Sequence, residues 1–299
     1  MIPERLMRAL KDPVYLGYQL RSRYFHAGLM RRYGELARAQ SCNALYLVLS
    51  FDCDTAEDID VVGELHQRLV DIGVAPVYAV PGQLLEKGEL VYRRIHESGG
   101  EFISHGYVEH TYFDHAKGRH ASCFFYDQVG PEAVAQDVSA ADKCLRDVLG
   151  IRPQGFRTPH FGTYQQPAQL EYLHGLLRQL SYAFSTSTTP YHAFRYGPLA
   201  PADGLVEIPV SGMGSAPLTI LDSWACFAAP DRTMTSTDYL REAAGAGRNY
   251  RQAGSGILNY YADPSHIHDQ AEFIRAVESW LTIAEPVNYR SLLEKTNVI

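Results

Sequence analysis

The chain has 299 residues, enough for one large domain with a substantial core or for two smaller ones. Hydrophobic residues make up 46% and charged residues 20% of the sequence, which excludes global disorder, and a formal net charge of −7 makes the chain a poor candidate for binding nucleic acid. The five cysteines are scattered and include no Cys-x-x-Cys pair, which argues against a disulfide framework and a thiolate zinc site.

The first forty residues differ from the rest in charge. They hold eight Lys or Arg against three Asp or Glu, a net charge of +5, so the remainder carries −12. Apolar residues at helical spacing predict one helix from about Tyr15 to Arg38. We expect residues 1–43 to form a basic helical arm. Two roles stay open for it: packing on the main domain, or peripheral contact of residues 1–40 with an anionic membrane surface.

Charged residues interrupt the first thirty positions, so no apolar region of a secretory signal is expected there. No run of 18 apolar residues occurs, which predicts a protein that does not span a membrane. The expected location is the cytoplasm, either free or at the inner face of the membrane.

From residue 44 onward, short apolar runs alternate with helical patterns. Repeated strand–helix units predict a parallel sheet, open or closed into a barrel, over residues 44–299. The segment 111–130 is expected to be a long loop that either covers a site or packs on its own aromatic side chains. Strands are expected at 44–51, 75–80, 101–104, 155–157, 182–184, 206–210, 219–221 and 257–261, and helices at 56–72, 83–97, 131–149, 168–180, 237–251 and 269–284.

Asp52 and Asp54 follow the apolar run 44–51. Residues two apart on a strand point the same way, so both carboxylates should reach the C-terminal edge of the sheet, where α/β proteins bind ligands. Two carboxylates so close together need a cation or a shared proton. The alternative is a helix N-cap followed by solvated acids.

A second candidate segment runs from Ser104 to His110 and contains two imidazoles and a carboxylate. His105, Glu109 and His110, together with Asp54, offer the nitrogen and oxygen ligands that a divalent metal such as zinc binds. The alternative is a turn whose histidines are exposed to solvent.

Arg157 lies in a third segment, Phe156–Gly162. An arginine beside acids can orient a carboxylate through paired hydrogen bonds. Pro159 and Gly162 make the backbone irregular, which suits an amide N–H that points at a developing oxyanion. Taken alone, the segment would be an ordinary loop between a strand and a helix.

Together these segments resemble the motifs of the polysaccharide deacetylase family, the NodB-like carbohydrate esterases. The resemblance covers about residues 44–285 and implies an α/β fold, a distorted (β/α)7 barrel with an N-terminal helical extension. The matching segments, in family order, are Ser50–Asp54, Gly100–Tyr107, Arg157–Gly162, Leu221–Trp224 and Ile257–His266.

The resemblance also implies roles for individual residues. Asp52 is expected to be the general base and Arg157 to orient it, while Asp54 and His105 bind the metal. Asp222 and Trp224 are expected to support the catalytic acid. The expected substrate-binding residues are Pro159, His160, Trp224 and Leu258.

Two motifs depart from the family pattern. The family usually places its two metal-binding histidines four residues apart, but here that position holds Glu109, and the next residue is His110. Residues five apart on a regular helix diverge by about 140°. We favour His110 over Glu109 as the third ligand because imidazole matches the family's ligand type.

The second departure concerns the catalytic acid. Asp263 stands where the family usually has a histidine before a proline, and His266 follows three residues later. The acid is therefore either Asp263 with a raised pKa, or His266 with Asp222 behind it. The reference pKa of about 6.5 favours His266 at neutral pH.

The activity implied by the resemblance is metal-dependent hydrolysis of an N-acyl group, acetyl or formyl, from an amino sugar. Zinc is the expected metal, with cobalt or nickel as alternatives. A cytoplasmic enzyme would act on a biosynthetic intermediate of lipopolysaccharide or another surface glycan, such as a sugar nucleotide or a lipid-linked saccharide. Two other functions stay open: an amidohydrolase for a small non-sugar amide, and an inactive glycan-binding module.

Overall fold

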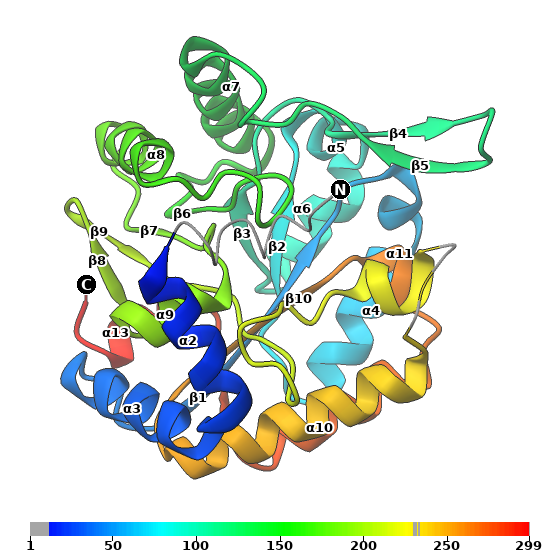
Figure 1. Ribbon diagram of the computed structural model, residues 1–299. Coiled ribbons are helices and arrows are strands. Elements are labelled where there is room, and N and C mark those ends of the chain that lie inside the picture. The colour runs from blue at the N-terminus through cyan, green and yellow to red at the C-terminus, as the bar shows by residue number, and fades with distance from the viewer. Residues whose placement is uncertain (1–11, 230–231, 233, 299) are drawn as a thin grey trace.

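The computed structural model describes residues 12–229, 232 and 234–298. A curved sheet lies at its centre, with helices around the outside (Figure 1). The strands of this sheet are β1 (Leu45–Asp52), β2 (Val77–Val80), β3 (Glu101–Ser104), β6 (Gly155–Phe156), β7 (Phe184–Ser185), β8 (Ala200–Ala202), β9 (Leu205–Glu207), β10 (Gly256–Ala262) and β11 (Glu285–Pro286). Their order is β10–β1–β2–β3–β6–β7–β9–β8, with β11 beside β1, and the described pairs are parallel apart from β8 with β9.

The helices cover this sheet and follow its strands in alternation, as the sequence pattern predicts. They are α2 (Pro13–Tyr24), α3 (His26–Ala39), α4 (Ala56–Asp71), α5 (Gly82–Lys87), α6 (Glu89–Glu97), α7 (Pro131–Leu149), α8 (Pro167–Gln179), α9 (Pro190–Tyr196), the π-helix η1 (Trp224–Ala228), α10 (Ser236–Ala253), α11 (Pro264–Ile267), α12 (Ala271–Leu281) and α13 (Tyr289–Lys295).

Strand β1 is an interior strand of the sheet and lies between β10 and β2. It pairs with β10 from Leu45 to Phe51, and nearly all of its side chains are buried, as expected for a strand covered on both faces. The sheet curls so that the segment after β9 contacts β10. The Ser211 N–H, beyond β9, donates to the carbonyl of Asn259 on β10 (2.7 Å), and the Asn259 N–H donates to Ser211 Oγ (2.9 Å). The prediction of a distorted α/β barrel is therefore confirmed.

The N-terminal segment forms two helices, so the prediction of one continuous helix was wrong. Phe25 lies between α2 and α3 with φ −131° and ψ 40°, outside the helical region. The apolar spacing that suggested one helix continues across this corner, because both helices bury a face against the same core. Gly88 likewise separates α5 from α6 where one helix was expected.

Two other expectations need correction. Residues 219–221 contribute an isolated bridge, Ile220 with Gly212, where a strand was expected. The segment 111–130, expected to be a loop, contains an antiparallel hairpin of β4 (Thr111–Asp114) and β5 (Arg119–Ser122), which projects from the barrel (Figure 1).

Helices α2 and α3 are packed on the barrel. Leu29, Met30 and Tyr33 are buried in the main core, and the Tyr33 hydroxyl bonds to both the N–H and the carbonyl of Ile257 on β10 (3.0 and 3.2 Å). Among the described residues, no helix combines the length and the apolar composition needed to cross a bilayer.

A glycine lets α3 approach α10 closely. A Cβ at Gly34 would lie 2.3 Å from the carbonyl oxygen of Ala253, at the end of α10. We expect Gly34→Ala to lower the free energy of unfolding by about 1–3 kcal/mol, because the helices must separate. Gly28→Ala, on the same helix, is the control: its Cβ would meet nothing within 4 Å. Equal chemical denaturation midpoints for the two variants would contradict this contact.

Candidate active site

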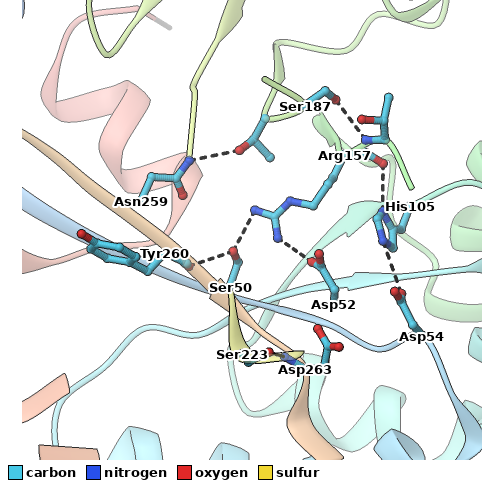
Figure 2. A network of polar contacts seen from close by, with 12 residues as sticks. Ser50, Asp52, Asp54, His105, Arg157, Ser187, Ser223, Asn259, Tyr260 and Asp263 are labelled. Carbon is cyan, nitrogen blue, oxygen red and sulfur yellow. Dashed lines mark hydrogen bonds and ion pairs between the residues drawn. The ribbon is translucent and has the colours of Figure 1, made fainter. Parts of the chain in front are cut away.

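Four candidate residues meet at the C-terminal ends of neighbouring parallel strands. Asp52 ends β1 and Asp54 follows two residues later, while His105 comes directly after β3 and Arg157 directly after β6. Figure 2 shows Asp52, Asp54 and His105 grouped beside the Arg157 side chain. The parallel sheet therefore brings residues that are distant in the sequence together at one site.

The Asp52–Arg157 pair is almost completely buried. Arg157 Nη1 donates to Asp52 Oδ1 at 2.5 Å, and Nη2 donates to Ser50 Oγ (2.8 Å) and to the Tyr289 hydroxyl (3.0 Å). Arg157 has no exposed surface, and Asp52 is 4% exposed. A buried charge requires such partners. The bond to Oδ1 leaves Asp52 Oδ2 as the oxygen free to accept a proton.

Asp54, His105 and His110 offer one ligand atom each within 4.8 Å of one another. Asp54 Oδ1 lies 3.3 Å from His105 Nε2 and 2.9 Å from His110 Nε2. Apart from these close contacts with one another, Asp54 Oδ1 and both ring nitrogens of His110 are buried without a hydrogen-bond partner, which is costly unless something else binds there. Two imidazole nitrogens and a carboxylate oxygen are donors that zinc accepts, so the site fits a divalent cation.

Neighbouring groups orient His105 and keep Asp54 ionised, as the binding of a cation requires. His105 Nδ1 donates to the Arg157 carbonyl (2.9 Å), so Nε2 is the ring nitrogen that faces Asp54. Burial alone would raise the pKa of Asp54, but the imidazoles of His110 and His105 hold that pKa well below its usual range. The carboxylate is therefore ionised and the His105 ligand atom is correctly oriented.

An irregular turn brings His110 to the site despite its unusual spacing. Gly106 has φ +78°, a left-handed conformation that side chains rarely adopt. Asp137 on α7 accepts the next two backbone N–H groups, those of Tyr107 (3.1 Å) and Val108 (2.8 Å). The helical divergence of residues five apart does not apply to such a turn.

Glu109 does not belong to the group formed by Asp54, His105 and His110. Its carboxylate pairs with Lys87 Nζ at 2.5 Å, and its N–H donates to Gln83 Oε1. The structure therefore does not bring Glu109 together with Asp54, because neighbouring residues of this turn point in opposite directions. Thr111, which follows His110, donates its hydroxyl to the Asp54 carbonyl (2.5 Å).

The two candidate acids form one pair. His266 Nδ1 lies 3.0 Å from Asp263 Oδ2, and Figure 2 shows Asp263 near Asp52. Burial would lower the pKa of His266, but Asp263 and the more distant Asp58 and Asp222 raise it to about 9. Burial raises the pKa of Asp263 to about 6.

Asp222 was expected behind His266, but Asp263 occupies that position at Nδ1. Asp222 Oδ1 instead accepts the Trp224 N–H (3.0 Å), and burial together with Asp263 raises the pKa of Asp222 to about 6. The sequence favoured His266 but did not reveal that the two acids are paired, because a short helix, α11, turns His266 back toward Asp263.

The expected substrate-binding residues differ in how deeply they are buried. Trp224 is 45% exposed, and His160 packs its ring on Phe125 and donates from Nε2 to the Cys123 carbonyl (2.8 Å). Pro159 is buried in the same loop as His160. Leu258 does not reach the site: it is fully buried near the start of β10, level with Leu47 on β1.

Sequence reasoning missed the residues that support Arg157 from the far side. Tyr289, on α13, accepts from Arg157 and donates to Asn259 Oδ1 (2.7 Å), while Asn259 Nδ2 donates to Thr186 Oγ1 (3.1 Å). Tyr289 lies outside every motif, so no local pattern could have indicated it.

The fold of the barrel can be compared with known proteins. No family model matches the sequence, and no curated protein matches it either. A candidate polysaccharide deacetylase from Mycobacterium smegmatis is similar in structure, with a TM-score of 0.64 and 17% sequence identity over 86% of this chain and 91% of that chain. A family 4 carbohydrate esterase from Streptomyces lividans, in complex with acetate, matches with a TM-score of 0.47 and 13% identity over 81% and 90% of the two chains. The mycobacterial likeness shows the fold.

Proposed function

We propose that this protein is a metal-dependent hydrolase that removes an N-acyl group from an amino sugar. One observation carries the proposal: a buried aspartate held by an arginine, Asp52 with Arg157, stands beside the Asp54–His105–His110 group. The first can act as a general base and the second can hold a cation. Amide hydrolysis needs both at one place.

The metal would be held by Asp54, His105 and His110, and we propose zinc, with cobalt or nickel as alternatives. When bound, it supplies Lewis-acid chemistry that polarises the acyl carbonyl and acidifies a water molecule. Asp52 takes the proton of the attacking water at Oδ2, because Arg157 holds Oδ1. His266 donates a proton from Nε2 to the departing amine, since Asp263 holds its Nδ1.

The pH profile should identify the acid. A general acid must be protonated, so hydrolysis that depends on His266 is expected to persist through neutral pH and to decline as the pH rises through about 9. If Asp263 were the acid, the decline would come near pH 6. We expect the alkaline limb of the kcat/KM profile to lie at about pH 9. His266→Gln should remove that limb. A limb near pH 6 that survives in His266→Gln would assign the acid to Asp263.

We propose a saccharide substrate because an exposed aromatic side chain, Trp224, begins η1 two residues after Asp222. Aromatic rings of this kind bind the apolar faces of sugars. The substrate proposed is a cytoplasmic intermediate of surface-glycan assembly that carries an acylated amino sugar, either nucleotide-linked or lipid-linked.

The test is hydrolysis of N-acetyl and N-formyl amino sugars by protein loaded with zinc, cobalt or nickel. Release of acetate or formate in a metal-dependent manner supports the proposal. Cleavage of small non-sugar amides in place of sugars would instead favour an amidohydrolase. Sugar binding without hydrolysis, together with no metal uptake, would indicate a glycan-binding module.

A further inference from the structure

We propose that the outer face of helix α2 is a docking surface for an anionic lipid bilayer, an inference that goes beyond the proposed hydrolase and rests on no part of it. Helix α2 has one buried side. Tyr15 and Tyr18 are 6% and 8% exposed, and both meet the ring of Tyr191 on α9 edge to face, at centroid distances of 5.1 and 5.4 Å. These contacts fix which side of the helix faces solvent, and Figure 1 shows α2 on the outside of the molecule near α9.

The side away from the barrel is apolar. Leu16, Leu20 and Tyr24 follow one another at four-residue spacing, which places them on a single stripe, and they are 40%, 49% and 66% exposed. Val14 (48%) and Phe25 (69%) are also exposed, at the start of the helix and just beyond its end, on a different side from the stripe. Five of the eleven large exposed hydrophobic residues in the described part of the chain lie within these twelve positions, so the patch is concentrated and not scattered.

The charge around the stripe is positive. Arg21 and Arg23 flank it on α2, and the Arg23 guanidinium lies 5.8 Å from the centre of the Tyr24 ring. Arg21 and Arg23 are the charged residues of α2 itself, and Asp12 caps the first turn of the helix. An apolar stripe bordered by arginines complements a surface of anionic headgroups above acyl chains.

A bilayer suits this surface better than a second copy of the chain. A twelve-residue helix is about 18 Å long, so one stripe on it falls well short of the roughly 800 Å² per partner of a stable protein interface. In a twofold contact the arginines of both copies would also meet. A Cβ built on Gly17, within the same exposed face, would meet nothing within 4 Å.

The experiment is vesicle co-flotation of the full chain, with phosphatidylcholine vesicles alone and with added phosphatidylglycerol. We expect binding to the anionic vesicles that weakens as salt rises. The double variant Leu16→Ser with Leu20→Ser should weaken the partition constant at least about tenfold. Arg21→Gln with Arg23→Gln should weaken it several-fold and flatten its salt dependence.

Matched controls are available on the same molecule. Leu90, on α6, is 76% exposed, and the Arg241 side chain, on α10, is 65% exposed. Leu90→Ser and Arg241→Gln should leave vesicle binding unchanged. All four variants should keep the wild-type melting temperature and the wild-type hydrolysis of a water-soluble substrate, which separates this proposal from the proposed function.

Three results would overturn the proposal. The first is equal binding, or none, with anionic and neutral vesicles. The second is anionic binding that survives the double leucine variant, because the contact would then lie elsewhere. The third is concentration-dependent dimerisation in sedimentation experiments that the leucine variant abolishes, because the face would then belong to a second copy.

Discussion

Asp52→Asn is expected to reduce hydrolysis by about 10²–10⁴-fold while the protein still binds its metal. The amide keeps an oxygen that can accept from Arg157 Nη1, but it cannot take the proton of the attacking water. The measurement is kcat with metal-loaded protein, alongside the metal content of the same sample. We also expect a lower melting temperature, because the buried guanidinium of Arg157 loses its counter-charge.

The control for this variant is Asp60→Asn, an exposed aspartate on α4. It should leave activity, metal content and melting temperature unchanged. Loss of metal from Asp52→Asn, with activity restored by excess zinc, would mean that the roles of Asp52 and Asp54 are exchanged.

His110→Ala is expected to weaken metal binding by more than about 100-fold, with a parallel loss of hydrolysis. The reason is geometric: His110 Nε2 is buried 2.9 Å from Asp54 Oδ1 and has no hydrogen-bond partner. The measurement is zinc affinity by competition with a chromophoric chelator, which needs no substrate.

Glu109→Gln is the matched variant for His110→Ala, because it changes the adjacent residue. Its carboxylate pairs with Lys87, so zinc affinity should stay within a few-fold of wild type. If Glu109→Gln weakened zinc affinity more than His110→Ala did, the third ligand would be Glu109 and the site as described would be refuted.

The sequence allowed prediction of what depends on local pattern. The apolar run 44–51 predicted strand β1. Because side chains alternate between the two faces of a strand, Asp52 and Asp54 were expected to point the same way at one edge of the sheet. Arg157 was expected beside acids because its segment follows another predicted strand, and the family resemblance implied that it orients Asp52. The strand and its two aspartates depend on residues that are close in the sequence, and the meeting of separate strand ends follows from the general rule for parallel sheets.

What the sequence did not reveal depends on contacts between distant residues. The position of His110 depends on the conformation of Gly106 and on Asp137, which lies on another helix. The contact of Tyr289 with Arg157 joins residues 132 positions apart. Leu258 was expected in a substrate pocket, but its place early in β10 sets it in the core, and a motif does not specify depth along a strand.

Arg157 holds both parts of the site at once. Its guanidinium binds Asp52, and its own carbonyl accepts from His105 Nδ1. A shift of this one residue would therefore move the general base and a metal-binding imidazole in the same step. Attempts to adapt the site to a different metal or a bulkier acyl group by altering strand β6 would change proton transfer as well.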